Sequence, residues 1–111
     1  MTTAFLFPGQ GSQHTGMGET LLPRFPEVVE EADEVLGYST TDLCLSPESS
    51  ERLGQTQFTQ PALYLVSCLQ AKAEQEDGRL PAFAAGHSVG EYAALQLAGA
   101  FSFADGLRFV A

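Results

Sequence analysis

The stretch that decides the fold is AFAAGHSVGEYAALQLAGA, residues 82–100. It begins with a short apolar run, passes through a turn with a glycine on each side of a serine, and continues in residues that favour a helix. A strand, a tight turn and a helix in this order are typical of a nucleophile elbow, which exposes the serine hydroxyl. The glycines alone would equally allow a turn without chemistry, and the predicted strand and helix favour the catalytic interpretation. We therefore predict a strand over residues 82–85, a nucleophile at Ser88 and a helix ending near Gly99.

Ser88 needs a base, and the sequence offers no good candidate. A serine hydroxyl becomes a strong nucleophile only when a base takes its proton, and in the α/β-hydrolase order the histidine follows the serine. No histidine follows Ser88. His87 is its neighbour, and adjacent side chains on a tight turn point apart, while His14 lies in a loop typical of solvated histidines. We expect the base outside residues 1–111.

The rest of the chain predicts further alternation of strands and helices. Strands separated by helices indicate a parallel sheet covered on both faces, and two strands are too few for such a sheet. We therefore expect residues 1–111 to be a piece of a larger α/β domain. The predicted elements are a strand over residues 3–7, a helix over residues 26–36, an irregular segment with two short helical turns over residues 43–57, a long helix from Thr59 or Gln60 to about residue 77, and a last helix capped by Ser102.

Charge and composition limit the class of protein. Five Lys and Arg against fourteen Asp and Glu give a formal net charge of -9, which disfavours nucleic acid and anionic membranes as partners. No apolar run approaches the roughly 20 residues of a membrane span, so we expect a soluble, cytoplasmic protein. Cys44 and Cys68 lack the spacing of a metal site or a disulfide framework, and we expect buried, reduced thiols and no metal.

Three stretches carry a resemblance to a known family: FLFPGQGSQ (residues 5–13), QTQFTQPAL (residues 55–63) and AGHSVGEYAAL (residues 85–95). With them the sequence resembles the acyltransferases that include malonyl-coenzyme A:acyl-carrier-protein transacylases and polyketide synthase acyltransferase domains. Residues 35–66 are most similar to the stand-alone, trans-acting polyketide synthase acyltransferases. The resemblance implies an α/β-hydrolase-like large subdomain containing residues 1–111, with a ferredoxin-like small subdomain beyond residue 111.

The resemblance also implies a role for each matching site residue. Ser88 would carry the acyl group, and the backbone amides of Gln10 and Val89 would form the oxyanion hole. Glycines on both sides of Gln10 would let its backbone approach the substrate carbonyl. Gln60 and His87 match positions that line the substrate site. The catalytic histidine and the arginine that holds the substrate carboxylate are both implied beyond Ala111.

We expect the other polar and aromatic residues that follow the elbow to have structural rather than catalytic roles. We expect Glu91 to be a buried structural acid or a partner of the helix dipole, and Tyr92 and Leu95 to belong to the core. Arg108 lies in the helix that carries the family's carboxylate-binding arginine, but that arginine comes a few residues later. We therefore expect Arg108 on the surface or in packing.

The implied reaction moves a malonyl group, or a related acyl group, from coenzyme A to Ser88 and then to the phosphopantetheine thiol of an acyl carrier protein. Malonyl-coenzyme A enters as substrate, and serine acyl transfer implies no cofactor. Three alternatives stay open: a hydrolase of carrier-bound acyl groups, the transacylase of fatty-acid synthesis, and a non-catalytic fragment or carrier-protein binding module. Without the downstream base and arginine, we expect residues 1–111 alone to be inactive.

Overall fold

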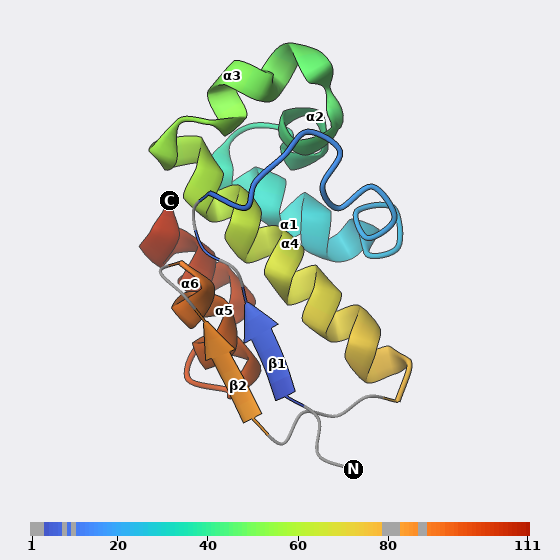
Figure 1. Cartoon of the computed structure of the whole chain (residues 1–111), viewed down its shortest axis with the longest axis vertical. Coiled ribbons are helices and arrows are strands. Elements are labelled where there is room, and N and C mark those ends of the chain that lie inside the picture. The colour runs from blue at the N-terminus through green and yellow to red at the C-terminus, as the bar shows by residue number, and fades with distance from the viewer. Residues whose placement is uncertain (1–3, 8, 10, 79–82, 87–88) are drawn as a thin grey trace.

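A computed structural model describes residues 4–7, 9, 11–78, 83–86 and 89–111 (Figure 1). The two described strands are separated by a run of helices, two more helices follow the second strand, and one helix, α4, is much longer than the rest. The elements are β1 (Ala4–Phe7), α1 (Pro26–Leu36), α2 (Thr40–Leu45), the 3-10 helix η1 (Pro47–Ser49), α3 (Ser50–Leu53), α4 (Thr56–Glu76), β2 (Phe83–Gly86), α5 (Gly90–Leu97) and α6 (Phe103–Val110).

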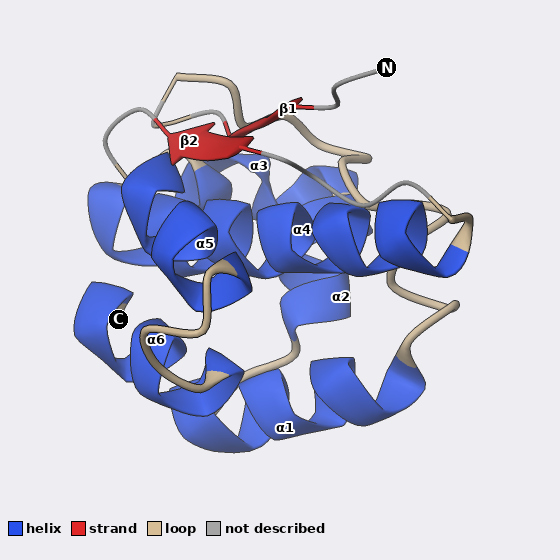
Figure 2. Cartoon of the chain, turned by 90° about the horizontal axis from the view of Figure 1, so that it is seen from below, coloured by secondary structure: helices blue, strands red, loops and turns tan. Residues whose placement is uncertain are grey.

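The described strands form one parallel pair, in which Ala4 aligns with Phe83 and Phe7 with Gly86. Helix α5 packs on both strands and on α4, and α6 packs on α4, α5 and α1. Figure 2 shows the resulting order: the strand pair, then α4 and α5, then α1 and α6 farthest from the strands. The wider parallel sheet expected from the sequence would need further strands, and it stays a prediction.

Helices α1 and α6 confirm their predictions because local signals define their ends. Proline occupies the first turn of α1, and Gly37 ends it at a φ of 83° with its N–H donating to the carbonyl of Asp33. Ser102 caps α6 by accepting a hydrogen bond from the N–H of Asp105. Both signals are read from a few consecutive residues.

The short helical turns predicted over residues 43–57 are found as η1 and α3, but the segment is more helical than predicted, since α2 and α4 extend into its two ends. Helix α2 already begins at Thr40, because Ser39 caps it by accepting from the N–H of Asp42 at 3.1 Å. One carboxylate oxygen of Asp33 also accepts from both the N–H and the hydroxyl of Thr40, each at 2.8 Å. These contacts join the end of α1 to the start of α2.

Helix α4 begins at Thr56, before the Thr59 or Gln60 that the sequence predicts. The hydroxyl of Thr59 donates to the carbonyls of Leu53 and Gln55, which fixes the first turn of α4 against the end of α3. Pro61 lies inside the helix, so the carbonyl of Gln57 lacks the N–H that a residue other than proline would supply.

A close contact between helices in the core joins α4 to α6. Tyr64 is fully buried, its hydroxyl donates to the carbonyl of Phe103 at 2.9 Å, and the two rings stack at 5.5 Å. A Cβ atom at Gly106 would lie 2.2 Å from the Tyr64 hydroxyl oxygen, so only glycine fits there. Burial raises the pKa of Tyr64, which keeps its hydroxyl a donor. The other large side chains that are almost completely buried include Leu43, Leu53, Leu65, Leu69 and Leu107.

The outer face of α5 is more exposed to solvent than the sequence predicts. Tyr92 is 38% exposed and Leu95 is 47% exposed, and Glu91 is exposed as well. The core prediction for Tyr92 and Leu95 is therefore wrong for the described structure. Glu91 is not a buried acid, but it lies in the first turn of α5, which agrees with the other expectation, a partner of the helix dipole. Helix α5 instead turns the small side chain of Ala93 toward the core.

Candidate active site

The register of the strand pair brings two sequence motifs to one edge. Phe7 aligns with Gly86 in the parallel pair, and each is the last residue of its strand. The chain that follows Phe7 holds the PGQGSQ motif, and the chain that follows Gly86 holds the elbow. Carboxyl ends of parallel strands are where α/β proteins place their sites. Both motifs therefore leave the pair at the edge where such a site is expected.

Hydrogen bonds close the first loop on both sides of position 10. The carbonyl of Gly9 accepts from the N–H of Ser12 at 3.3 Å and from its hydroxyl at 2.6 Å. The N–H of Gly11 donates to the side-chain oxygen of Gln13 at 2.7 Å. Gly11 has a φ of 110°, a conformation that residues with a side chain rarely adopt. The two glycines thus permit a compact turn next to β1.

Val89 stands at the start of the elbow helix. It has helical dihedral angles, with φ −59° and ψ −22°, and is 3% exposed. Its carbonyl accepts from the N–H of Tyr92 at 3.1 Å, so the first turn of α5 begins directly after the predicted nucleophile. The first N–H groups of a helix lack intrahelical partners and lie at the positive end of its dipole. This arrangement suits a group that develops negative charge beside Val89.

The remaining predicted site residues divide into described and undescribed positions. Gln60 is half-buried near the start of α4, the helix that packs on α5. Gln10, His87 and Ser88 lie outside the described residues, so their roles stay predictions.

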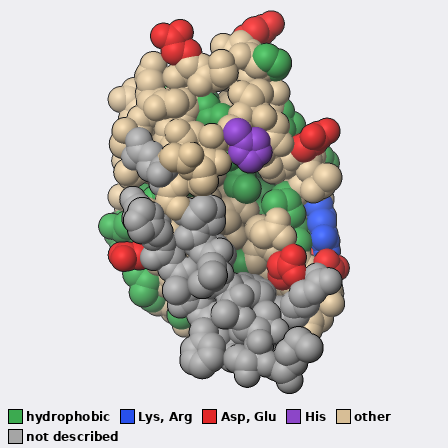
Figure 3. All heavy atoms as spheres, viewed as in Figure 1, with side chains coloured by type: hydrophobic (Ala, Val, Ile, Leu, Met, Phe, Trp, Pro, Cys, Tyr) green, Lys and Arg blue, Asp and Glu red, His purple; other side chains and the backbone are tan. Residues whose placement is uncertain are grey.

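Neither His14 nor Arg108 has the surroundings of a catalytic group. Figure 3 shows a histidine on the molecular surface, and His14, the histidine among the described residues, is exposed with Nδ1 3.2 Å from the carbonyl oxygen of Ser12. Arg108 is exposed and donates to a carboxylate oxygen of Asp105 at 3.1 Å. Arg108 is therefore a surface residue, as the sequence predicts.

The two thiols are unsuited to nucleophilic chemistry. Cys44 and Cys68 are free and buried, as predicted, and burial raises the pKa of each to about 12. Each thiol is then protonated at neutral pH and lacks the thiolate that attacks substrates or binds metals. Among the described residues, no group of three or more His, Cys, Asp and Glu side chains could hold a metal ion. The described helices include none with the length and apolar character needed to cross a membrane.

Sequence reasoning missed Arg52. Its guanidinium lies over the rings of Tyr38 and Phe58, which come from segments on either side of α2 and α3. The spacing of these three residues follows neither a helical nor a strand period. The available signal was compositional: Arg52 is one of only five basic residues in the chain.

Comparisons with known proteins agree with the motifs. Residues 4–111 match the family described as acyl transferase domain. The polyketide biosynthesis protein ThaF of Burkholderia thailandensis is 59% identical over 96% of this chain, which corresponds to 9% of that protein. The polyketide biosynthesis malonyl CoA-acyl carrier protein transacylase BaeC of Bacillus velezensis is 53% identical over 96% of this chain and 37% of its own length. The crystal structure of malonyl CoA-acyl carrier protein transacylase from Burkholderia pseudomallei matches with a TM-score of 0.94 at 53% identity, covering 99% of this chain and 38% of that one.

The chain belongs to the acyl transferase domain family. This confirms the resemblance seen in the three motifs, and the solved transacylase shows that the described elements adopt the acyltransferase fold. The chain spans well under half the length of each of these relatives.

Proposed function

We propose that this chain is the N-terminal part of a serine acyltransferase that moves a malonyl group, or a related acyl group, from coenzyme A to an acyl carrier protein. The observation that carries the proposal is the alignment of Phe7 with Gly86, from which the glutamine loop and the serine elbow leave the same edge. An oxyanion hole assembled from these two loops needs this juxtaposition. The polyketide biosynthesis relatives support that pathway over fatty-acid synthesis.

The chemistry follows from the proposed roles. The Ser88 hydroxyl attacks the thioester carbonyl while the base takes its proton, and the amides of Gln10 and Val89 stabilise the oxyanion. Collapse of this intermediate breaks the carbon–sulfur bond, and coenzyme A leaves as the thiol with that proton. The carrier's phosphopantetheine thiol then attacks the serine ester and gives up its proton to the base. Ser88 is regenerated as the alcohol, and Gln60 and His87 line the substrate site.

The part of the protein beyond residue 111 completes this proposal. It supplies the catalytic histidine, the arginine for the malonyl carboxylate, the other strands of a parallel sheet and a ferredoxin-like small subdomain. The reaction needs a nucleophile, a base and oxyanion donors, so no cofactor is proposed. Coenzyme A thioesters as donors place the protein in the cytoplasm.

The test is intact-protein mass spectrometry of the full-length protein that contains this chain, before and after mixing with malonyl-coenzyme A. We expect one malonyl increment on Ser88 and its loss in Ser88→Ala, while Ser50→Ala, a change at an exposed serine on α3, acylates normally. Subsequent addition of a carrier protein that bears a phosphopantetheine arm with a free thiol should transfer the increment to the carrier. Release of free malonate instead would identify a hydrolase, and the absence of any increment would contradict acyl-enzyme chemistry.

A further inference from the structure

Arg52 is an exposed cation held by aromatic rings. The central carbon of its guanidinium lies 4.7 Å from the ring centre of Phe58 and 5.7 Å from that of Tyr38. These two rings meet edge to face, with centres 5.5 Å apart at 70°. Stacking on aromatic faces restrains the guanidinium and leaves the N–H groups at its edge available for other partners.

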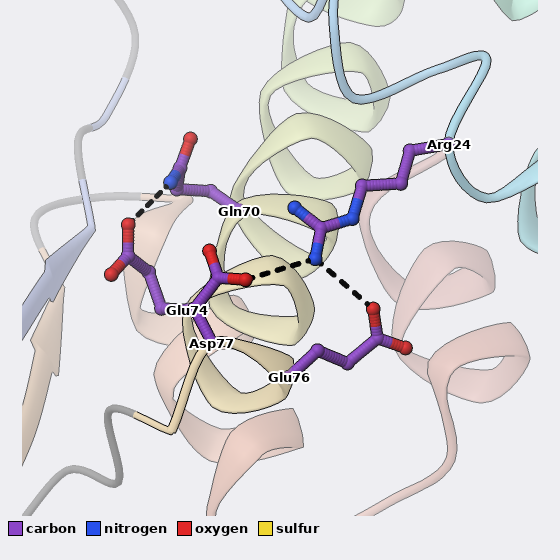
Figure 4. Close-up of polar contacts among 5 residues, drawn as sticks. All are labelled: Arg24, Gln70, Glu74, Glu76 and Asp77. Atoms are coloured by element: carbon purple, nitrogen blue, oxygen red, sulfur yellow. Dashed lines mark hydrogen bonds and ion pairs between the residues drawn. The ribbon is translucent and has the colours of Figure 1, made fainter.

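The chain gives Arg52 no carboxylate partner within its described part. Arg24 forms ion pairs with Glu76 and Asp77 at the end of α4, each at 3.3 Å (Figure 4). Arg108 pairs with an acid on its own helix. Arg52 forms no such ion pair among the described residues, although the chain carries a net charge of -9. An arginine with an unused N–H fork in so acidic a chain is suited to an anion from outside.

Arg52 lies toward the end of the molecule where the candidate site lies. Figure 1 shows α2, α3 and the first turns of α4 at the end toward which both strands point. Phe58, which holds Arg52, and the predicted site residue Gln60 are two residues apart on α4. They are separated by about 3 Å along the helix axis and point to opposite sides of it. Arg52 is therefore near the reaction edge but separated from it by the start of α4.

We propose that Arg52 binds the phosphate at the far end of the substrate's pantetheine arm. The proposal rests on the proposed function, in which both the acyl donor and the carrier protein present a pantetheine thiol whose other end bears a phosphate. A guanidinium fork matches phosphate oxygens bidentately. An anchor away from the reacting carbonyl fits the separation of these groups along the arm, and such remote contacts contribute binding energy that positions the thioester.

The chain provides a matched control in Lys72. Its ammonium lies 5.3 Å from the ring centre of Phe25, it is exposed, and it too forms no ion pair among the described residues. It stands 14 residues after Phe58 on α4, about 21 Å farther along the axis. Lys72→Gln therefore changes net charge as Arg52→Gln does, but far from the proposed phosphate position.

The first experiment is calorimetric titration of the full-length protein that contains this chain with 4′-phosphopantetheine and with pantetheine, which differ only in the phosphate. We expect tighter binding of the phosphorylated ligand and about a tenfold loss of this preference in Arg52→Gln, the scale of one charge-assisted hydrogen bond. Arg52→Lys should keep part of the preference, because it retains the charge and loses the fork. Lys72→Gln should keep all of it. Equal affinities for the two ligands in the unmodified chain, or equal losses in Arg52→Gln and Lys72→Gln, would overturn the proposal.

The second experiment assigns the source of the phosphate in the full-length protein. If Arg52 holds coenzyme A, Arg52→Gln raises the KM for malonyl-coenzyme A in the acylation of Ser88 with little change in kcat. If it holds the carrier's arm, the variant raises the KM for the carrier protein with a free phosphopantetheine thiol in the transfer step. Failure of Ser88 to acylate would refute the proposed function alone, since the titration with phosphopantetheine still reports on Arg52. Unchanged KM values in both steps would refute the role of Arg52 in the reaction.

Discussion

Gly106 in the core and Gly11 in the loop after β1 are constrained in different ways. At Gly106, where α6 meets α4, an added Cβ would lie 2.2 Å from the Tyr64 hydroxyl oxygen and 2.5 Å from a ring carbon of Phe101. At Gly11, in the loop after β1, an added Cβ would meet nothing within 4 Å, but the φ of 110° excludes most side chains. The core therefore selects glycine for lack of space, and the site edge selects it for its backbone conformation.

The largest expected effect comes from Gly106→Ala. Overpacking against two rings costs about 3 kcal/mol, and the better helix propensity of alanine offsets about 1 kcal/mol of it. Chemical denaturation should then show a loss of about 2 kcal/mol in the free energy of unfolding. Gly54→Ala is the matched control, because its Cβ would lie 3.5 Å from the nearest atom and its φ of −76° suits alanine.

A double-mutant cycle sharpens this comparison. Tyr64→Phe removes the hydroxyl closest to the new methyl group, so Gly106→Ala should cost less in the Tyr64→Phe background. The rescue should be partial, since the ring carbon of Phe101 stays 2.5 Å from the new atom. An equal cost in both backgrounds would show that the Tyr64 hydroxyl does not limit the contact.

Gly11→Ala should lower the free energy of unfolding less than Gly106→Ala does, and it should also slow the reaction. Forcing a side chain into this backbone conformation costs about 1 kcal/mol of stability. Gly78→Ala provides the control, since Gly78 also has a positive φ, 88°, with nothing within 4 Å of its added Cβ, and lies at the end of α4. We expect similar losses in unfolding free energy from both variants, but slower acylation of Ser88 only in Gly11→Ala, because the adjacent Gln10 amide is displaced. Equal acylation rates in the two variants would contradict the proposed oxyanion role of the loop.

The same contrast explains what could be predicted from the sequence. Helices α1 and α6 were predictable because Gly37 and Ser102 mark their boundaries within a few residues. The start of α2 carries a comparable local cap at Ser39 and was missed. The start of α4 was not predictable in this way, because it depends on the Leu53 carbonyl, an acceptor that becomes available only after the neighbouring helix has packed.

The features of the candidate site also differ in how far the sequence predicts them. Motifs at the ends of parallel strands were predictable as one site because the strands share an edge, and the register of β1 and β2 agrees with this. The stacking of Arg52 on Tyr38 and Phe58 was not predictable, since it unites residues without a common period. The core prediction for Tyr92 and Leu95 failed because apolar character alone does not imply burial.

The smallest effect is expected at the end of α4 away from the candidate site, where Arg24 bridges Glu76 and Asp77. These side chains are 39%, 50% and 51% exposed, so Arg24→Gln should lower the free energy of unfolding by about 0.5 kcal/mol at low salt. Because salt screens exposed charges, the difference from the unmodified chain should nearly vanish at about 1 M salt. Arg108→Gln, which breaks a more exposed pair within one helix, should show a smaller loss with the same salt dependence.

A loss in Arg24→Gln that persists at high salt would instead assign the stabilisation to the stacking of Arg24 on Phe25, whose ring centre is 5.3 Å from the guanidinium. An arginine would then be stabilised by stacking on an aromatic ring at each end of α4. Of these two, Arg52, at the end near the candidate site, is the one whose guanidinium N–H groups form no ion pair among the described residues.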